Sequence, residues 1–296
     1  MAQRDLNPLP DAAELRSFAR AAAHLLAQHP SPAPGARTVR RRAGVGLQHL
    51  DHRDYVPGDD VRHIDWRLTA RRQRPILRQF EAETSSDWFL LLDASSSMVA
   101  GGAARWQGAV RATAAMAFAL LELGNRVALV AFADEVVAEC PSGRGASHFP
   151  TIARTLRGLH PAPRGARSNL AACARRIRGT ASGFVISDFL GPADLRPGLA
   201  ALRERCVRLH ALLVEDPREL RLAGDGLREL VDVESGATLS CEADPLSAEH
   251  ASQAQAELRQ RLRRFATLGG IAFDAWDVAV PWQRALIGHL AGARAA

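Results

Sequence analysis

The chain has 296 residues, of which 47% are hydrophobic and 24% are charged, and this composition is typical of a globular protein with a sizeable buried core. All 38 basic residues are arginines, and the absence of lysine excludes a P-loop nucleotide site, a protein-kinase site and Schiff-base catalysis, because each needs a lysine side chain. No apolar stretch approaches the roughly 18 residues of a membrane-spanning helix, and the N-terminus lacks an apolar signal core, so we expect a cytoplasmic protein.

The net charge is unevenly distributed along the chain. Residues 1–80 carry 14 arginines against 8 acidic residues, whereas the two charges balance over residues 81–296. A basic region of this kind is either an ordinary solvated surface or a binding surface for nucleic acid or an acidic protein. Acidic residues are interleaved throughout it and no nucleic-acid-binding motif accompanies it, so a nucleic-acid partner is the less favoured alternative.

The cysteines are widely and evenly spaced and match no zinc-binding pattern. Each lies in a mostly apolar segment, which favours buried free thiols over disulfides. They are Cys140, Cys173, Cys206 and Cys241.

The first predicted element is an amphipathic helix over residues 11–28, with Asp11 as its N-cap. Its buried stripe is predicted from apolar residues at helical spacing, which are Leu15, Phe18, Ala22, Leu25 and Leu26. A proline-rich linker follows at residues 30–35, and the polar residues 37–85 are predicted to be irregular.

From Trp88 onward the sequence alternates between apolar strands and helices. The strands are apolar almost without interruption, which predicts a mostly parallel, doubly wound α/β sheet that is buried on both faces. The strand pair around Asp134 predicts a hairpin with one antiparallel edge strand. We predict strands at about 88–93, 126–132, 135–140, 183–188, 207–214, 229–233 and 271–277. We predict helices at about 105–123, 147–158, 169–178, 193–204, 246–267 and 281–291.

The most informative loop is Asp93-Ala94-Ser95-Ser96-Ser97, which directly follows an apolar run. It places one carboxylate and two hydroxyls at the end of a buried strand, and such oxygen ligands suit a small cation such as Mg²⁺, which keeps several waters. In a doubly wound sheet, sites form beyond the carboxyl ends of the strands. Two further oxygen donors are expected at this edge, Ser168 before a predicted helix and Asp188 at the end of another strand.

The same residues have a simpler interpretation, because aspartate and serine favour helix N-caps and solvated turns. Short motifs of this kind also occur by chance. The convergence of three separate loops favours the metal interpretation. In that interpretation Asp93, Ser95 and Ser97 bind the ion directly or through water. Ser168 completes the site or holds a water, and Asp188 acts from outside the inner coordination sphere.

A segment before this loop resembles a known bacterial family. Similarity to the proteins grouped as domain of unknown function 58 is carried by the run His52-Arg53-Asp54-Tyr55-Val56-Pro57-Gly58-Asp59-Asp60-Val61-Arg62-His63-Ile64-Asp65-Trp66-Arg67, followed by Thr69-Ala70-Arg71 and Arg78-Gln79-Phe80-Glu81. The resemblance extends from about Gly44 to the C-terminus. It implies a von Willebrand factor A-like fold with a metal-ion-dependent adhesion site.

The resemblance also implies roles for the site residues. Asp93, Ser95 and Ser97 match the adhesion-site triplet, Ser168 stands where the family usually has threonine, and Asp188 matches the later aspartate. The implied cofactor is Mg²⁺, or alternatively Mn²⁺ or Ca²⁺, and it would capture an acidic residue of a client protein.

Members of this family are usually paired with MoxR-type AAA+ ATPases, which implies a protein-interaction module that acts as an adaptor or co-chaperone. Such a module would work in the assembly or activation of other proteins. The absence of lysine fits this role, because ATP hydrolysis would have to come from another chain.

We expect two parts in the chain. Residues 1–85 hold the first helix, the linker and an Arg/Asp-rich segment, and they are expected to pack on a von Willebrand factor A-like domain at residues 86–296. Four arginines lie among aspartates in that segment: Arg53, Arg62, Arg67 and Arg71. They form either an ion-pair network that fixes the N-terminal region to the sheet domain or a docking surface for a partner, and the sequence does not separate the two.

Enzymatic interpretations have weaker signals, and we expect that the chain is not an enzyme. No Gly-x-Ser-x-Gly elbow accompanies the serines. His49, His52 and His63 have no glutamate placed as a general base. The alternative function is a metal-dependent hydrolase of phosphorylated substrates that uses Asp93 and Asp188.

Overall fold

The computed structural model describes residues 7–27, 49–54, 64–72, 74–80, 87–163, 165–177, 181–190, 195–220 and 226–293. The chain divides into two compact units. The first combines residues 1–31 with residues 86–296 and is called the sheet unit. The second comprises residues 32–85 and is called the signature unit.

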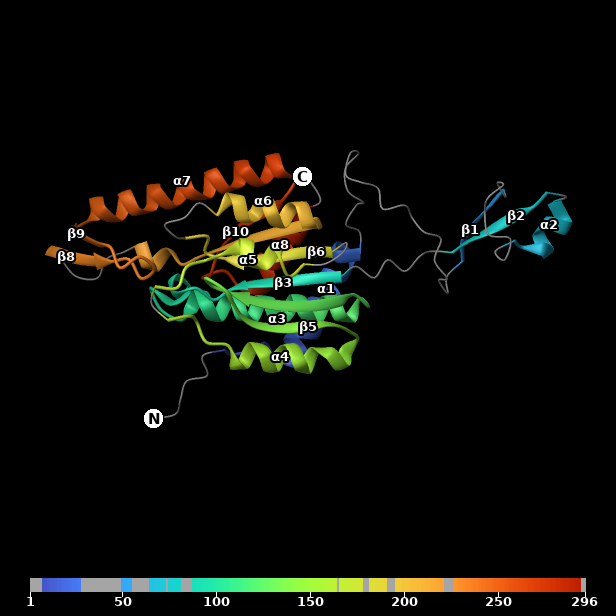
Figure 1. The fold of residues 1–296 in the computed structure, drawn as a ribbon, viewed down its shortest axis with the longest axis horizontal. Helices are drawn as coiled ribbons and strands as arrows, with labels where there is room; N and C mark the ends of the chain where they lie inside the picture. Colours follow the sequence, from blue (N-terminus) through green and yellow to red (C-terminus); the bar gives the residue numbers. More distant parts are fainter. Residues whose placement is uncertain are drawn as a thin grey trace. The chain divides into compact units, whose positions relative to one another are not determined.

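The sheet unit is built on six strands in the order β10-β7-β6-β3-β4-β5 (Figure 1). Neighbouring strands are parallel except for β4 and β5, which form an antiparallel pair with β5 at the edge. The expected doubly wound α/β fold of the von Willebrand factor A type is therefore confirmed, and so is its antiparallel edge strand. The strands are β3 Asp87–Asp93, β4 Arg126–Phe132, β5 Val136–Arg144, β6 Ala181–Ser187, β7 Cys206–Glu215 and β10 Ala272–Asp277.

Helices cover both faces of this sheet (Figure 1). Alternate residues of β3 belong to different cores. Leu90 and Leu92 pack with α1, α3, α4 and α8, whereas Phe89 and Leu91 pack with α5, α6 and α7. Side chains of a strand alternate between faces, so a strand that is apolar on both sides is buried on both sides. The helices are α1 Ala12–Ala27, α3 Ala104–Glu122, α4 Phe149–Gly158, α5 Leu170–Ala174, α6 Arg196–Arg205, α7 Pro245–Gly269 and α8 Trp282–Gly292.

The N-terminal helix α1 is part of the sheet unit, and it contacts α3 and α8. Asp11 is its N-cap as predicted, because Asp11 Oδ1 accepts hydrogen bonds from the backbone N–H groups of Ala13 and Glu14, both at 2.8 Å. Phe18 packs edge-on against Trp282 with ring centroids 5.4 Å apart. The structure thus groups α1 with the sheet, whereas the sequence analysis placed it with residues 37–85. Packing of the signature segment on the sheet stays a prediction.

The signature unit contains an antiparallel strand pair, β1 His49–Asp54 and β2 Ile76–Phe80, and the short helix α2 Trp66–Arg72. The N-terminus of α2 is capped by Asp65, whose Oδ1 accepts the backbone N–H of Leu68 at 3.1 Å. The prediction that residues 37–85 are irregular was therefore wrong. The sequence of β1, His-Leu-Asp-His-Arg-Asp, has no apolar alternation by which a strand is recognised.

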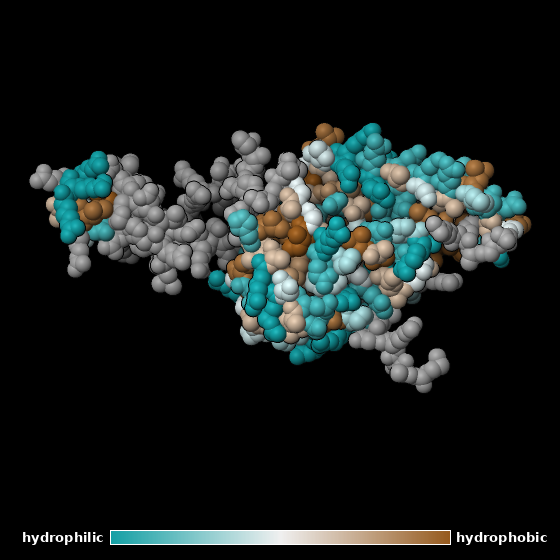
Figure 2. Space-filling view, turned by 180° about the vertical axis from the view of Figure 1, so that it is seen from behind, coloured by the Kyte–Doolittle hydropathy of each residue, from teal (hydrophilic) through white to brown (hydrophobic). Residues whose placement is uncertain are grey.

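A second antiparallel strand pair, β8 Gly226–Val231 and β9 Thr238–Ala243, lies outside the six-stranded sheet, next to the start of α7 (Figure 1). The predicted strand at 229–233 overlaps β8, but β9 was not predicted. This strand pair exposes large apolar side chains, including Leu227 at 77% and Leu239 at 63%. The face of the molecule in Figure 2 is mostly hydrophilic, with its apolar residues in small groups.

All four cysteines are free, as predicted, and Cys140, Cys173 and Cys206 are buried. Cys241, on β9, is half-buried. Burial raises the pKa of the Cys206 thiol to about 12, so this thiol is protonated and unreactive. Among the residues that the structure describes, no helix is both long and apolar enough to cross a bilayer.

Candidate functional site

The candidate site lies at the carboxyl edge of the sheet, between two adjacent parallel strands. Asp93 is the last residue of β3, and Ser187 is the last residue of β6, its direct neighbour. Strands β4 and β5 lie on one side of β3, and the later strands β6, β7 and β10 lie on its other side. This is the point at which the strand order reverses, where doubly wound sheets bind their ligands.

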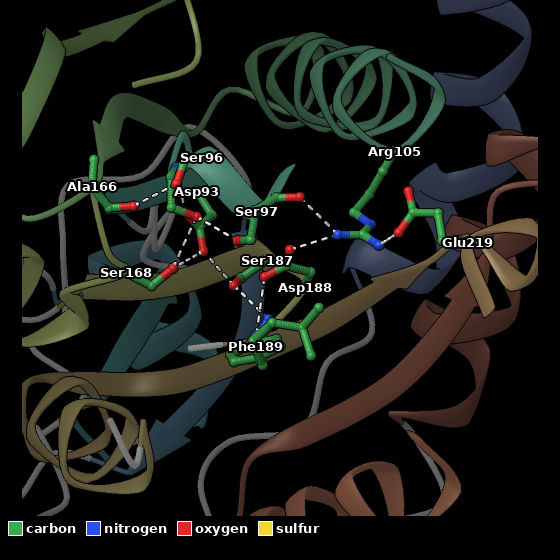
Figure 3. A network of polar contacts seen from close by, with 12 residues as sticks. Asp93, Ser96, Ser97, Arg105, Ala166, Ser168, Ser187, Asp188, Phe189 and Glu219 are labelled. Atoms are coloured by element: carbon green, nitrogen blue, oxygen red, sulfur yellow. Dashed lines mark hydrogen bonds and ion pairs between the residues drawn. The ribbon is translucent and has the colours of Figure 1, made fainter. Parts of the chain in front are cut away.

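The carboxylate of Asp93 is fully buried and accepts hydrogen bonds from three serines (Figure 3). Its Oδ1 accepts the backbone N–H of Ser95 at 2.9 Å, which folds the loop back over the strand end. Its Oδ2 accepts the hydroxyl of Ser187 at 2.5 Å and the hydroxyl of Ser168. The carboxylate is thus held by the loop after β3, by the last residue of β6 and by the loop before α5.

The remaining predicted ligands lie in the same network. Ser168 Oγ lies 3.2 Å from Ser95 Oγ, and Ser95 Oγ lies 3.0 Å from Ser97 Oγ. All three serines are buried, with exposed fractions of 7% or less. The structure therefore brings Asp93, Ser95, Ser97 and Ser168 together. These four side chains form the oxygen cluster.

The simpler interpretation of these residues as helix caps does not describe the structure. Ser95 precedes a 3₁₀ helix at Ser96–Val99, but its side chain makes no capping hydrogen bond. Helix α5 is capped by Asn169, whose side chain accepts the N–H of Ala172 at 3.3 Å, and Ser168 stands one residue earlier. The hydroxyls are directed to Asp93 and to one another, and not to free helix N–H groups.

Asp188 lies beside the oxygen cluster and is paired with an arginine (Figure 3). Arg105 Nη1, from the first turn of α3, donates to Asp188 Oδ2 at 2.7 Å and to the backbone oxygen of Ser97 at 3.0 Å. Arg105 Nη2 is paired with Glu219. Gly101 leaves room for that carboxylate, because a Cβ at position 101 would clash with Glu219 Cγ.

The backbone after β6 is bent sharply to form this arrangement. Phe189 has a φ of +49°, a conformation that is strained for a bulky residue. The bend lets the N–H of Phe189 donate to Ser187 Oγ at 2.8 Å and the N–H of Leu190 donate to Asp188 Oδ1 at 3.0 Å. The strain is thus offset by hydrogen bonds that fix two of the polar side chains at the site.

Three residues of the site were not predicted from the sequence: Arg105, Ser187 and Glu219. Ser187 immediately precedes Asp188 at a predicted strand end, so its position was a usable signal. Arg105 and Glu219 lie near polar segment ends and resemble ordinary surface residues in the sequence. Only tertiary packing shows that the Arg105 side chain is 4% exposed.

Burial raises the pKa of the carboxyl groups at the site. The pKa of Asp93 is raised by burial, against the effect of its serine hydrogen bonds. Burial first and then the Asp93 charge raise the pKa of Asp188 to about 6, although Arg105 opposes them. Burial also raises the pKa of Glu234, a buried residue in the turn between β8 and β9, to about 7. In each case the loss of hydration on burial outweighs the hydrogen bonds and, for Asp188, the ion pair that favour the ionised form.

The charged side chains that the structure describes at the site are mostly acidic. In the part of the site that the structure describes there are four carboxylates, those of Asp93, Asp188, Glu219 and Glu234, and Arg105 forms ion pairs with Asp188 and Glu219. Ser97, Arg105, Glu219 and Glu234 line one cavity of about 410 Å³. A site this acidic and this buried has the electrostatics of a cation site.

The donor set of the oxygen cluster also fits a small divalent cation. One carboxylate and three hydroxyls are hard oxygen donors, and Mg²⁺ needs only one or two protein carboxylates because waters fill its other positions. Within the described part of the chain, no three His, Cys, Asp or Glu side chains form a group that could hold a metal ion. The fit therefore depends on the hydroxyls together with Asp93.

The predicted docking arginines lie in the signature unit. Arg62 lies outside the described residues, and so does His63. Arg53 lies on β1 and Arg67 in α2, but the structure does not describe their side chains. Arg71, in the last turn of α2, is exposed. Both interpretations of these arginines, as an ion-pair network and as a docking surface, stay predictions.

The fold and the oxygen cluster define a von Willebrand factor A-like domain with an acidic, hydroxyl-rich site at the carboxyl edge of its sheet. The chain belongs to the family described as "Protein of unknown function DUF58", which it matches over residues 51–261. The predicted family is thus confirmed.

Several bacterial proteins are similar in sequence. The uncharacterized proteins Mb1516 of Mycobacterium bovis and Rv1480 of Mycobacterium tuberculosis are each 34% identical over 227 residues, which cover 75% of this chain and 71% of theirs. The uncharacterized protein YeaD of Bacillus subtilis is 31% identical over 108 residues, which cover 36% of this chain and 25% of YeaD.

Solved structures with a similar arrangement are more distant in sequence. The conserved hypothetical protein BatB from Bacteroides thetaiotaomicron has 12% identity and a TM-score of 0.41, over 71% of this chain and 100% of that chain. The pilus adhesin SpaC from Lactobacillus rhamnosus GG, in its open conformation, has 12% identity and a TM-score of 0.42, over 71% of this chain and 30% of that chain.

Proposed function

We propose that this protein is a metal-dependent protein-interaction module. A divalent cation, Mg²⁺ in the first instance and Mn²⁺ or Ca²⁺ as alternatives, is held by Asp93, Ser95 and Ser97. Ser168 completes the site or holds a bound water, and Asp188 acts from outside the inner coordination sphere. An acidic residue of a partner protein supplies a further ligand.

The observation that carries this proposal is the buried oxygen cluster. Asp93 has no exposed surface, and its carboxylate is bonded to hydroxyls and forms no ion pair with a cation among the described residues. Arg105 is ion-paired with Asp188 and Glu219, and it makes no ion pair with Asp93. A divalent cation at Asp93 would supply the missing positive charge, and it would act as a Lewis acid that attracts an additional carboxylate.

The state of Asp188 favours an interaction module over the alternative hydrolase. Asp188 Oδ2 is bound by Arg105 at 2.7 Å and its Oδ1 accepts the N–H of Leu190. A carboxylate that is already ion-paired with a guanidinium is poorly placed to act as a second metal ligand or as a nucleophile. The hydroxyl of Ser95 is bonded to those of Ser97 and Ser168.

We further propose that the partner machinery includes a MoxR-type AAA+ ATPase, so that the chain works as an adaptor or co-chaperone in assembly or activation of other proteins. The family membership and the lack of lysine support this role. The first places the chain in the family whose resemblance implies such a partner, and the second leaves ATP hydrolysis to another chain.

The test is capture of a co-expressed MoxR-type ATPase or client by the full chain, in Mg²⁺ and in excess EDTA. We expect capture in Mg²⁺ only, and we expect Asp93→Asn to abolish it because the substitution removes the ligand charge but keeps an acceptor oxygen. Asp87→Asn is the matched control, since Asp87 lies at the opposite end of β3. Equal capture in Mg²⁺ and EDTA would refute the proposal.

A further inference from the structure

The turn between β8 and β9 is attached to the loops of the oxygen cluster. The backbone oxygen of Val233 accepts the N–H of Gly165 at 2.8 Å. It also lies 3.3 Å from the hydroxyl of Ser96, which contacts the backbone oxygen of Ala166 at 3.1 Å. One carbonyl of the turn therefore contacts both the Asp93 loop and the loop that leads to Ser168.

The conformation of this turn is fixed from within by Asp232. Its Oδ1 accepts the N–H of Glu234 at 2.8 Å, and its Oδ2 accepts the hydroxyl of Ser235 at 2.7 Å. The N–H of Gly236, at a φ of +72° that favours glycine, donates to the backbone oxygen of Asp232 at 2.8 Å. These bonds hold the backbone of Glu234 in one position, so the direction of its side chain is also restricted.

Glu234 has an unusual environment for a residue in a surface turn. It is only 3% exposed, and neither of its carboxylate oxygens has a hydrogen-bond partner in the part of the chain that the structure describes. It lines the same cavity as Ser97, and the Ser97 hydroxyl and the charges of Asp188 and Asp93 all influence its ionisation. The side chain therefore faces the oxygen cluster.

A buried carboxylate without hydrogen bonds is unfavourable unless a cation compensates it. Arg105 lines the same cavity, but its two terminal nitrogens are bonded to Asp188, to the backbone oxygen of Ser97 and to Glu219. Instead of turning outward to water, Glu234 is held next to three other acidic side chains. A metal ion at the oxygen cluster would account for this position, because it would bind the two free oxygens.

We propose that Glu234 is an internal ligand of the metal site, so that the turn between β8 and β9 occupies the coordination position that an acidic residue of a partner would take. This inference rests on the proposed function, because it needs a metal at the oxygen cluster. A partner carboxylate then binds by exchange with Glu234, and the β8–β9 pair is released from the cluster when the partner binds. The module is closed by its own carboxylate until a partner competes for the ion.

The first measurement is Mg²⁺ binding to the full chain by isothermal titration calorimetry. We expect Glu234→Gln to weaken Mg²⁺ binding by at least about tenfold, the size of effect seen when a metal loses a supporting carboxylate. Glu229→Gln is the matched control, since it makes the same charge change on an exposed position of β8. We expect its affinity to equal that of the unmodified chain.

The second measurement is hydrogen exchange of the backbone amides of residues 226–243, with and without Mg²⁺. We expect Mg²⁺ to slow exchange in the unmodified chain and in Glu229→Gln, and to have no effect on this segment in Glu234→Gln. Hydrogen exchange distinguishes two roles of Glu234. A metal ligand would fix the turn when Mg²⁺ binds, whereas a distant charge would change the affinity for Mg²⁺ without slowing exchange in the turn.

The inference is overturned if Glu234→Gln binds Mg²⁺ as tightly as the unmodified chain. It is also overturned if Mg²⁺ binds but leaves exchange of residues 226–243 unchanged in the unmodified chain. In both cases the proposed metal site itself survives. If the folded, unmodified chain binds no divalent cation at all, the proposed function fails, and the role of Glu234 as a ligand fails with it.

Discussion

At the scale of single residues, Arg105 supplies a positive charge to the carboxylates around the site. Its guanidinium is bonded to Asp188, to Glu219 and to the backbone oxygen of Ser97. The Arg105 and Asp188 side chains are only 4% and 1% exposed, so water screens this ion pair very little. Loss of the guanidinium would leave two carboxylates in a buried environment without a cation.

We expect Arg105→Met to lower the free energy of unfolding by about 3–5 kcal/mol, because removing one partner of a buried ion pair leaves the other charge uncompensated. Equilibrium unfolding in urea, without added metal, measures this change. Arg126→Met is the control, since Arg126 is paired with Asp87 at 3.4 Å on the surface, where an ion pair contributes about 0–1 kcal/mol. A loss for Arg105→Met no larger than that of the control would contradict the role of Arg105.

The residues of the site differ in how far the sequence could predict them. Asp93, Ser95 and Ser97 form a local motif after an apolar strand, and Ser168 immediately precedes a helix, so pattern and topology together placed them at one edge. Glu234 gave no such signal. It immediately follows the strand predicted at 229–233, and only the closed turn shows that its side chain is buried.

At the scale of elements, α1 is a structural part of the sheet unit. Leu15, Phe18, Ala22 and Leu26 belong to the main core. Asn7, which lies upstream of the helix, also contributes, because the Trp106 indole N–H donates to Asn7 Oδ1 at 2.6 Å, and the Asn7 amide donates to Leu159 O at 2.6 Å. The N-terminal segment therefore packs on helices α3 and α8, which lie on one face of the sheet.

We expect Phe18→Ala to lower the free energy of unfolding by about 3–5 kcal/mol, the usual cost of removing a buried aromatic ring. Thermal and urea unfolding of the full chain would measure it. Arg16→Ala, on the exposed side of the same helix, should change stability by no more than about 0.5 kcal/mol. Equal stability of the two variants would show that α1 is not docked on the sheet.

The strands show why some elements were predictable and others were not. In the central strands β3, β4, β6 and β7, burial on both faces requires continuous apolar runs, and such runs are visible in the sequence. All residues of β8 are exposed, and its stability depends on pairing with β9 and not on a buried face. The β1–β2 pair was missed for the related reason that polar residues dominate β1.

At the scale of the whole molecule, sheet topology creates the site. The loops after β3 and β6 and the loop before α5 are separated by up to about 95 residues of sequence, yet a parallel sheet places their ends at the same edge. The family match, over residues 51–261, includes parts of both the signature unit and the sheet unit. The excess positive charge lies in residues 1–80, while the candidate metal site of the sheet unit is acidic.

The most direct test of the account is calorimetric titration of the full chain with Mg²⁺, for the unmodified protein, Asp93→Asn and Asp87→Asn. We expect the unmodified protein and Asp87→Asn to bind Mg²⁺ with equal affinity, and Asp93→Asn to bind it at least about a hundredfold more weakly. Binding by Asp93→Asn at the affinity of the unmodified protein, or a folded unmodified protein that binds no divalent cation, would contradict the claim that the oxygen cluster is a metal site.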